Sequence, residues 1–286
     1  MTGQNDEHII EANGRARIII RNGDVVEVGE PLIRNCPLAQ RFAHPIPEMN
    51  KEHIAANIRY RIAAFGMCTP DRQVEDDREF VGFGASEILS FGMKMGLIDA
   101  VVLACDGAGT VIVTRPSMVQ GIGGRMSGLV STTPYSSVIS RIKAGGGIVL
   151  DPEDGTMNQV AGVARAVEEG FTWIAVTVAL PDDALAIRRM FPDVMIVGVH
   201  VTGLSYDESQ ALVAASDLVT ACASGHIREI AGKTALVQAG VSVPVFAMTK
   251  KGKELLIEKI RQSDDPVLIK PTKLPSLGGN QPDPLI

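Results

Sequence analysis

Between residues 83 and 261, short apolar runs rich in β-branched residues alternate with stretches whose apolar residues recur at helical spacing. This alternation is typical of α/β folds, because parallel strands need a helical crossover to return to the same edge of a sheet. We therefore expect an α/β core with a mostly parallel sheet and flanking helices in Rossmann-like layers. The expected strands include Ala100–Ala104, Ile148–Leu150, Trp173–Val178, Val194–Val199, Leu218–Ala221 and Val243–Ala247.

The first 80 residues follow a different pattern. Ala16–Ile20 and Val25–Val28 flank Asn22-Gly23, a dipeptide typical of tight β-hairpins. Met49–Phe65 carries apolar residues at helical spacing and is followed by Gly66, which suits a helix C-cap. The sequence thus predicts three parts: an antiparallel hairpin, a helix and cysteine-bearing loops in residues 1–80, the parallel α/β core in residues 81–265, and a proline-rich extended tail in residues 266–286.

Composition excludes several classes of partner. The net charge of −6 and the lack of a basic stripe argue against nucleic acid. No apolar run has the roughly 18 residues of a membrane span, and the polar, acidic N-terminus does not resemble a signal peptide. We expect a cytoplasmic protein. We also expect a homo-oligomer, with the tail either mobile or laid against a neighbouring subunit.

Four of the apolar runs stop at a polar residue that can do chemistry. The residues at these ends are Cys105 with Asp106, then His200, Cys222, and Lys250. Because parallel strands end at one edge of their sheet, where such folds place the ligand crevice, these side chains are expected to meet. Cys105, Asp106, His200 and Cys222 are candidate catalytic residues, and Lys250 is a candidate cation for the substrate.

The segment after the first core strand contains two glycines. Gly107, Gly109 and Thr110 could bring backbone N–H groups close to an anion. The segment lacks the GxGxxG pattern, and the residues after it are β-like, so a dinucleotide site is rejected. A tight hairpin turn explains the same residues equally well.

A second glycine cluster spans residues 121–128. Gly123, Gly124, Arg125 and Ser127 could form a nest for a phosphate, sulfonate or carboxylate group. The Gly-Lys-Ser/Thr ending of a P-loop is missing, which argues against ATP hydrolysis. The alternative is a flexible connector. Arg125 is the strongest candidate, because a guanidinium inside a glycine run has little packing role.

A thiol, a hydroxyl and an imidazole follow the strand at residues 218–221. Cys222 before a helix N-terminus, with His226 nearby, could be a nucleophile or a soft metal ligand, and Ser224 could bind substrate. The alternative is a buried cysteine with Ser224 as N-cap. His200 and Thr202 end the neighbouring strand, although a lone histidine is often structural.

The four cysteines could also share a metal. Cys36 and Cys68 stand in proline-marked loops of the N-terminal part, and with Cys105 and Cys222 they would make four sulfur ligands. Four thiolates suit zinc or an iron–sulfur cluster, whereas three would leave an open position. Free buried cysteines are the alternative. The cofactor is thus left open.

Several longer strings resemble the methanogenesis marker protein 8 family of archaea. They are Gly14–Ile18, Cys36–Leu38, Phe65–Pro70, Phe80–Leu89, Cys105–Val111 and Val119–Arg125. The resemblance extends over about residues 8–265. It implies a protein that accompanies methyl-coenzyme M reductase in methane-forming archaea, in an anaerobic cytoplasm where free thiols and oxygen-sensitive clusters persist. It supplies no site residues.

Three functions remain open at this point. The first is a thiol- or metal-dependent enzyme or maturation factor that acts on an anionic coenzyme or coenzyme precursor. The second is a non-catalytic assembly factor for methyl-coenzyme M reductase or a related complex. The third is a metal-free enzyme for a small phosphate or carboxylate substrate.

Overall fold

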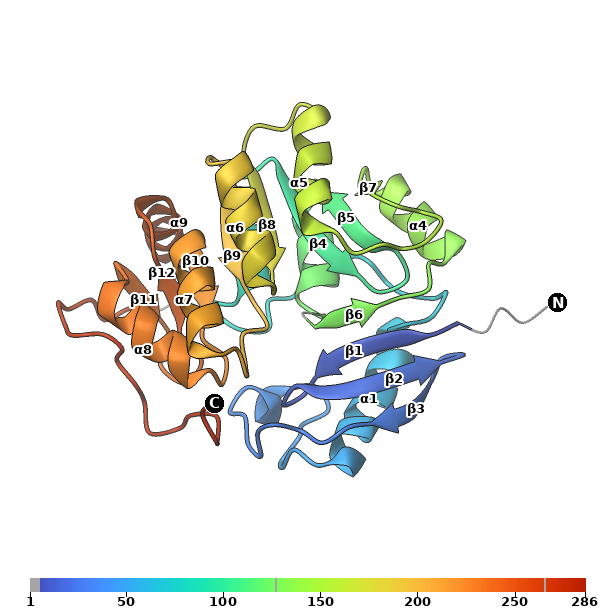
Figure 1. Cartoon of the computed structure of the whole chain (residues 1–286), viewed down its shortest axis with the longest axis horizontal. Coiled ribbons are helices and arrows are strands. Elements are labelled where there is room, and N and C mark those ends of the chain that lie inside the picture. Colours follow the sequence, from blue (N-terminus) through green and yellow to red (C-terminus); the bar gives the residue numbers. More distant parts are fainter. Residues whose placement is uncertain (1–5, 127, 265) are drawn as a thin grey trace.

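A computed structural model describes residues 6–126, 128–264 and 266–286. Figure 1 shows two units, a small one built from the first three strands and α1, and a larger one above it. The larger unit holds an eight-stranded sheet in the order β11-β12-β10-β9-β8-β4-β5-β7. The small unit holds a four-stranded sheet in the order β3-β2-β1-β6.

The described chain contains the following elements. The strands are β1 (His8–Ala12), β2 (Ala16–Arg21), β3 (Asp24–Val28), β4 (Ala100–Cys105), β5 (Gly109–Val113), β6 (Leu129–Ser131), β7 (Ile148–Val149), β8 (Ile174–Val178), β9 (Met195–Gly198), β10 (Leu218–Thr220), β11 (Val237–Ala239) and β12 (Val245–Ala247). The helices are α1 (Lys51–Phe65), α2 (Ala85–Lys94), α3 (Pro116–Met118), α4 (Ser136–Ala144), α5 (Gln159–Glu168), α6 (Pro181–Met190), α7 (Tyr206–Ala215), α8 (Gly225–Thr234) and α9 (Lys250–Arg261), with a 3-10 turn η1 (Ala39–Arg41) and a π-helical turn η2 (Val119–Gly123).

The α/β class is confirmed, but the prediction of a mostly parallel sheet is wrong. Pairing is parallel between β4 and β8, β8 and β9, and β9 and β10. It is antiparallel where β5, β7, β11 and β12 extend the sheet on both sides. The turn between β4 and β5 has Gly107 at φ 83 and Gly109 at φ 75, a left-handed backbone that glycine adopts without strain. Of the two interpretations of this segment, the hairpin turn is therefore the one that the structure shows.

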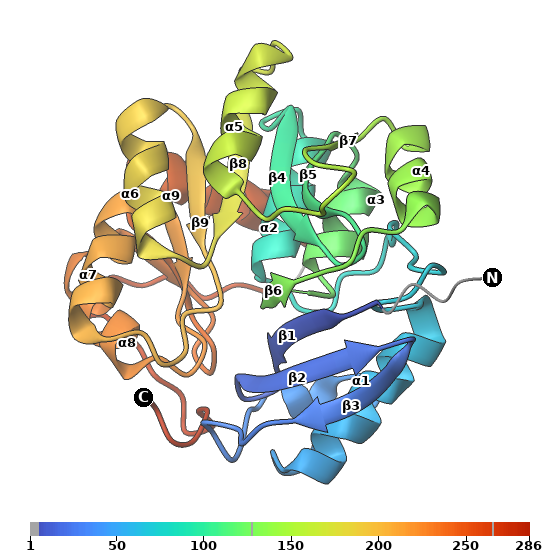
Figure 2. The same ribbon diagram turned by 45° about the vertical axis from the view of Figure 1, so that its right-hand side comes forward.

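Helices cover both faces of the large sheet. Apolar side chains of β4 alternate, so that Val101 and Leu103 pack toward α2, α4 and α9, while Ala100 and Val102 pack toward α5, α6, α7 and α8. Figure 2 shows α5, α6, α7 and α8 in front of the sheet and α2 and α9 behind it. No helix in the described part of the chain is long and apolar enough to cross a membrane.

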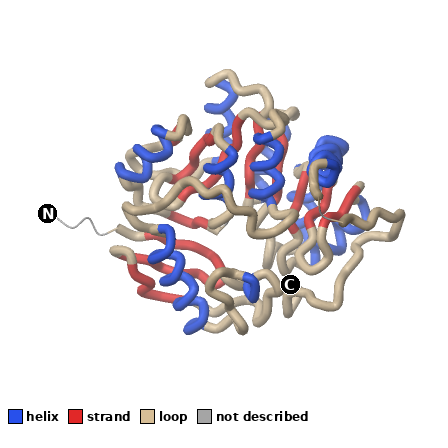
Figure 3. Tube along the Cα trace, turned by 180° about the vertical axis from the view of Figure 1, so that it is seen from behind, coloured by secondary structure: helices blue, strands red, loops and turns tan. Residues whose placement is uncertain are grey.

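The small unit confirms the predicted hairpin and helix. Asn22 and Gly23 have positive φ values of 50 and 75 at the turn between β2 and β3. Asn50 caps α1 by accepting a hydrogen bond from a backbone N–H, and Gly66 ends the helix at φ 73. Seen from behind, α1 lies across one face of the small sheet (Figure 3). The fourth strand, β6, comes from the middle of the chain and pairs with β1.

The tail contacts its own chain. Asp283 forms a β-bridge with Asn35 of the small unit. The amide of Ile286 donates to the carbonyl of Ala223, and the amide of Gly225 donates to the carbonyl of Ile286. The tail thus joins the loop after β10 to the small unit.

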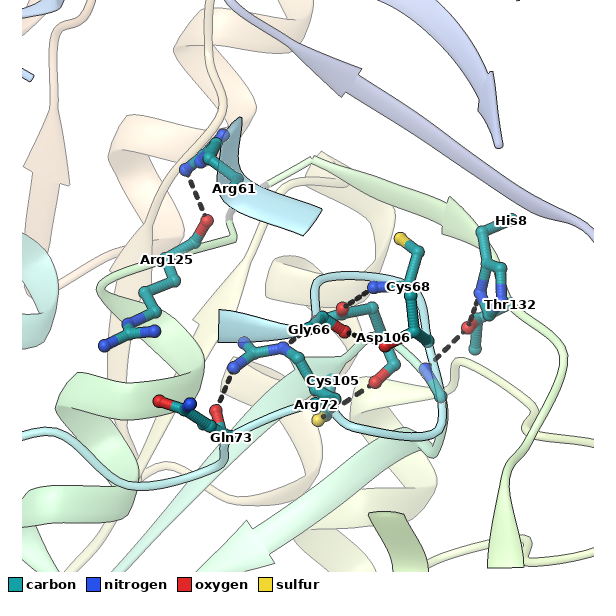
Figure 4. A network of polar contacts seen from close by, with 12 residues as sticks. His8, Arg61, Gly66, Cys68, Arg72, Gln73, Cys105, Asp106, Arg125 and Thr132 are labelled. Carbon is teal, nitrogen blue, oxygen red and sulfur yellow. Dashed lines mark hydrogen bonds and ion pairs between the residues drawn. The ribbon is translucent and has the colours of Figure 1, made fainter. Parts of the chain in front are cut away.

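A buried polar network connects the two units (Figure 4). The Asp106 carboxylate, at the turn after β4, accepts from Arg72 Nε at 2.8 Å and from the Cys68 amide at 2.7 Å. Both partners belong to the loop that follows α1, and the Arg72 and Asp106 side chains are 0% exposed. Burial would raise the pKa of Asp106, but the Arg72 charge and these hydrogen bonds hold it below its usual range. Asp106 therefore fixes the small unit on the core.

The substitution Asp106→Asn should destabilise the protein by about 3–5 kcal/mol, because it leaves the Arg72 guanidinium buried without a countercharge. Urea denaturation at neutral pH measures the effect. The control is Asp24→Asn, whose partner Arg59 and own side chain are 54% and 68% exposed; its stability should stay close to that of the parent protein. A similar loss for both variants would contradict this role.

Candidate functional site

A cavity of about 660 Å³ lies between the two units. Its wall on the large unit is the edge where β4, β8, β9 and β10 end, with Ala104, Thr177, His200, Thr220 and Cys222 in the lining. The small unit covers this edge with η1 and α1. The volume is in the range of pockets for small organic ligands.

Arg125 supplies unpaired donors in this lining. Its side chain is 6% exposed, forms an ion pair with Asp76, and has its guanidinium carbon 4.2 Å from the Phe65 ring centroid. Nε and Nη1 are buried and have no hydrogen-bond partner within the described residues. Burial would raise the pKa of Asp76, but hydrogen bonds from Arg78 and Arg125 lower it, so the Asp76 carboxylate stays charged beside Arg125. Buried donors without a partner cost free energy, and the guanidinium donor set is of the kind that pairs with anions.

Three further arginines line the same cavity. Arg61 on α1 donates from Nη2 to the Arg125 carbonyl at 2.6 Å. Burial, with the charge of Arg72 next, lowers the pKa of Arg61 to about 10, which still leaves the guanidinium charged at neutral pH. Arg41 in η1 and Arg78 in the connector before α2 complete the set. The small unit thus gives the cavity a positive side.

His200 lies in the cavity wall at the end of β9. Its Nε2 is 2.9 Å from Glu11 Oε2 of β1, and its backbone adopts φ 57, a left-handed value that costs energy for a residue with a Cβ. The hydrogen bond with His200 is the largest of the causes that lower the pKa of Glu11 to about 2. Partial burial raises this pKa, and Arg15 lowers it further. A charged Glu11 thus orients the imidazole from the opposite unit.

Cys222 ends β10 beside His200 and also has a left-handed backbone, at φ 42. Its carbonyl accepts from Arg228 Nη2 at 2.7 Å. Burial raises the pKa of the thiol. The expected activation of the thiolate by the helix N-terminus is therefore outweighed by burial, and Cys222 is a neutral thiol in the cavity wall.

The neighbours of Cys222 have structural roles. Ser224 is the N-cap of α8, accepting from the Ile227 amide at 3.2 Å, and Thr202 accepts from the Ala223 amide at 3.2 Å. His226 bonds through Nδ1 to the Leu204 carbonyl and is outside the cavity lining. The structure does not place His226 as a partner for the thiol.

Cys105 lies in the core, outside the cavity lining. It shares the buried face of β4 with Val101 and Leu103, and burial raises the pKa of its thiol to about 12. The glycine segment that follows is the hairpin turn, where Gly107 donates to Thr132 and Thr110 donates to Gln159. Asp106, Gly107, Gly109 and Thr110 are absent from the described lining. The structure thus supports the hairpin interpretation of this segment.

The second glycine cluster does reach the cavity. Gly123 and Gly124 line it together with Arg125, at the end of η2. A Cβ at Gly124 would lie 2.6 Å from the Gln120 carbonyl oxygen, so only glycine fits this turn. Ser127 lies outside the described residues.

The prediction for Lys250 is wrong because β12 is antiparallel to β10. Ala247 at the end of β12 pairs with Leu218 at the start of β10. Thr249 then caps α9 and donates to Asp217, which precedes β10. Lys250 therefore lies at the opposite edge of the sheet from the cavity.

The prediction of a metal site shared by four cysteines is also wrong. Cys68 and Cys105 lie beside the Asp106–Arg72 ion pair, whereas Cys222 and Cys36 both lie near Arg228. Among the described residues, no group of three or more His, Cys, Asp or Glu side chains could hold a metal ion. The fold divides the thiols between two places.

Sequence reasoning missed three residues, of which Arg61 lines the cavity and Glu11 contacts His200 in its wall. Glu11 lies in a short strand that was not predicted, and Arg61 lies on α1 without any motif around it. His8 was also missed; it is buried and bonds to Thr132 and Tyr135 in the network between the units.

The fold and the cavity define a two-sheet α/β protein with a pocket between its units. A family model described as uncharacterized protein conserved in archaea (DUF2099) matches residues 8–261, and the chain belongs to this family. It is 43% identical over 284 residues to uncharacterized protein MJ0054 of Methanocaldococcus jannaschii, covering 98% of this chain and 100% of that protein.

One of the solved structures that align with this chain does so with a low identity and a low TM-score. It is a xenon derivative of the F420-reducing NiFe hydrogenase complex from Methanosarcina barkeri, with 14% identity and a TM-score of 0.32. The alignment covers 62% of this chain and 72% of that chain. Such a TM-score supports no argument about fold or function.

The Glu11–His200 contact predicts a pH-dependent stability. Because folding lowers the pKa of Glu11 from 4.5 to about 2, its charge stabilises the protein fully above pH 4.5, and this is lost as the pH falls towards 2. Glu11→Gln should be less stable at pH 7 by about 1 kcal/mol, after allowance for solvent screening. The difference should vanish near pH 2.

Urea denaturation between pH 2 and pH 7 measures this difference. Glu229→Gln, which removes an exposed ion pair with Lys233, is the control and should stay close to the parent protein throughout. A Glu11→Gln deficit of constant size across this range would show that the contact does not depend on the Glu11 charge.

Proposed function

We propose that this protein binds an anionic small molecule of coenzyme type in the cavity between its units, and acts on it as an enzyme or maturation factor. The observation that carries the proposal is Arg125, whose buried Nε and Nη1 lack partners in the described cavity wall. Such donors are suited to a carboxylate, phosphate or sulfonate group.

The distribution of charge supports an anionic ligand. Arg41, Arg61 and Arg78 surround the same space, and Asp76 balances only part of their charge together with that of Arg125. Glu87 in the wall is engaged by Gln120, Ser86 and a backbone amide. The cavity therefore favours a ligand with more than one negative charge.

Two groups at the strand ends could carry out chemistry on that ligand. His200, oriented by Glu11, has the arrangement of a general acid or base, with one ring nitrogen held by a carboxylate. Cys222 offers a thiol in the same wall. Proton transfer by His200 is the chemistry that this wall supports, with the neutral Cys222 thiol as a second proton donor, and it needs no metal held by cysteines.

We further propose that the family is that of methanogenesis marker protein 8 and that the ligand belongs to methanogenic metabolism. The support is the resemblance of the strings quoted above and the relative in Methanocaldococcus jannaschii. Four of those strings contribute residues to the cavity wall: Cys36–Leu38, Phe65–Pro70, Phe80–Leu89 and Val119–Arg125.

The substitution Arg125→Gln should weaken binding of pyrophosphate, used as a simple polyanion, by about 10- to 100-fold, because it removes a charge-assisted donor set. Titration calorimetry measures the affinity, with circular dichroism to check folding. Arg61→Gln should also weaken binding, while the exposed Arg59→Gln is the control. Unchanged affinity in both cavity variants would refute the anion site.

Alkylation should separate the four thiols. Iodoacetamide under native conditions should label Cys222 and Cys36, which are partly exposed, and leave the buried Cys68 and Cys105 unlabelled. Labelling of Cys222 should be slow at neutral pH and faster at alkaline pH, because burial raises the pKa of this thiol. Peptide mass spectrometry identifies the labelled residues. Labelling of Cys105 as fast as Cys222 would contradict the placement of Cys105 in the core.

A further inference from the structure

Aromatic side chains are concentrated in the cavity. The chain has eight Phe, three Tyr and one Trp, and five of these line the cavity: Phe42, Tyr60, Phe65, Phe80 and Phe83. They come from the loop before α1, from α1 itself and from the connector before α2. Aromatic residues are therefore gathered on the side of the cavity that also carries the arginines.

Three of these rings present free surface. Phe42, Tyr60 and Phe80 are 38%, 41% and 46% exposed. Large aromatic side chains in contact with water cost free energy that core packing would recover, so their position along one hollow calls for an occupant. Phe65 differs from them, because the guanidinium groups of Arg72 and Arg125 lie over its ring at 5.2 and 4.2 Å.

The ring geometry is suited to stacking. His44 and Tyr60 are stacked at a centroid distance of 5.4 Å and an interplanar angle of 20°. Both residues line the cavity, so the pair adds a flat surface to its wall. Arg41 and Arg78 line the same part of the small unit and its connector. A small inorganic anion would use the arginines but leave these rings without a partner.

We propose that the ligand joins a planar heteroaromatic ring to its anionic group, as in a nucleotide-type coenzyme, with the ring stacked on Phe80, Phe42 or the His44–Tyr60 pair. This proposal rests on the anion site proposed above and names the class of molecule that fills it. Aromatic side chains that stack on a ring add to the affinity in sites that bind bases. The anionic group then lies at Arg125, and the cavity volume of about 660 Å³ leaves room for both parts.

The experiment compares matched probes on the full chain by titration calorimetry. AMP, GMP, FMN and pyridoxal phosphate carry a ring and a phosphate, and ribose 5-phosphate and pyrophosphate carry no ring. At least one ring phosphate should bind about 10-fold or more tightly than ribose 5-phosphate. Phe80→Leu and Tyr60→Leu should remove most of that advantage and leave ribose 5-phosphate binding unchanged. Trp173→Leu, at an exposed aromatic outside this cavity, is the control.

The outcomes separate the two proposals. Ribose 5-phosphate and pyrophosphate could bind through Arg125 while no probe with a ring and a phosphate binds more tightly than they do. That result would overturn the proposal of a ring-binding site and leave the anion site in place. If a ring phosphate binds tightly and the Phe80 and Tyr60 variants keep its full affinity, stacking on these residues is also overturned. If none of the six probes binds, both proposals fail.

Discussion

The buried Asp106 carboxylate is the interaction on which the rest of the structure depends. It stands at the end of β4 in the large sheet and receives both Arg72 Nε and the Cys68 amide from the loop after α1. Both charged side chains are fully buried, so separating them would leave an unpaired charge in the interior, which would destabilise the protein. This contact, with the tail contact at Asn35, holds the small unit over the strand ends.

The cavity gains its character from that placement. The large sheet alone would present an edge with a thiol and an imidazole and little charge. The small unit adds arginines and aromatic rings, and through Glu11 it also orients His200. The groups proposed for binding and those proposed for chemistry therefore come from different units. His200 and Cys222 both have left-handed backbones, and both line the cavity between the units.

The sequence predicted the layers and the edge of the site better than the residues in it. Alternating apolar runs indicate strands and helices, but they do not give the direction of a strand, so the direction of β12 was predicted wrongly and Lys250 was placed at the wrong edge. Cys105 was predicted to be catalytic, but it follows the same period of two as Val101 and Leu103, and the structure places it with them on the core face. Arg61 reaches the cavity, and Glu11 reaches His200, only through the contact between units, which no local pattern encodes.

The pairing of β6 with β1 has a consequence for the order in which the chain folds. The small sheet needs residues 129–131, which are synthesised only after β4 and β5, so β1 emerges from the ribosome as an unpaired edge. The first 80 residues thus cannot complete their own sheet. We therefore expect the two units to fold together, although each has its own apolar core. A polypeptide cut after residue 80 would expose that edge to pairing with other chains.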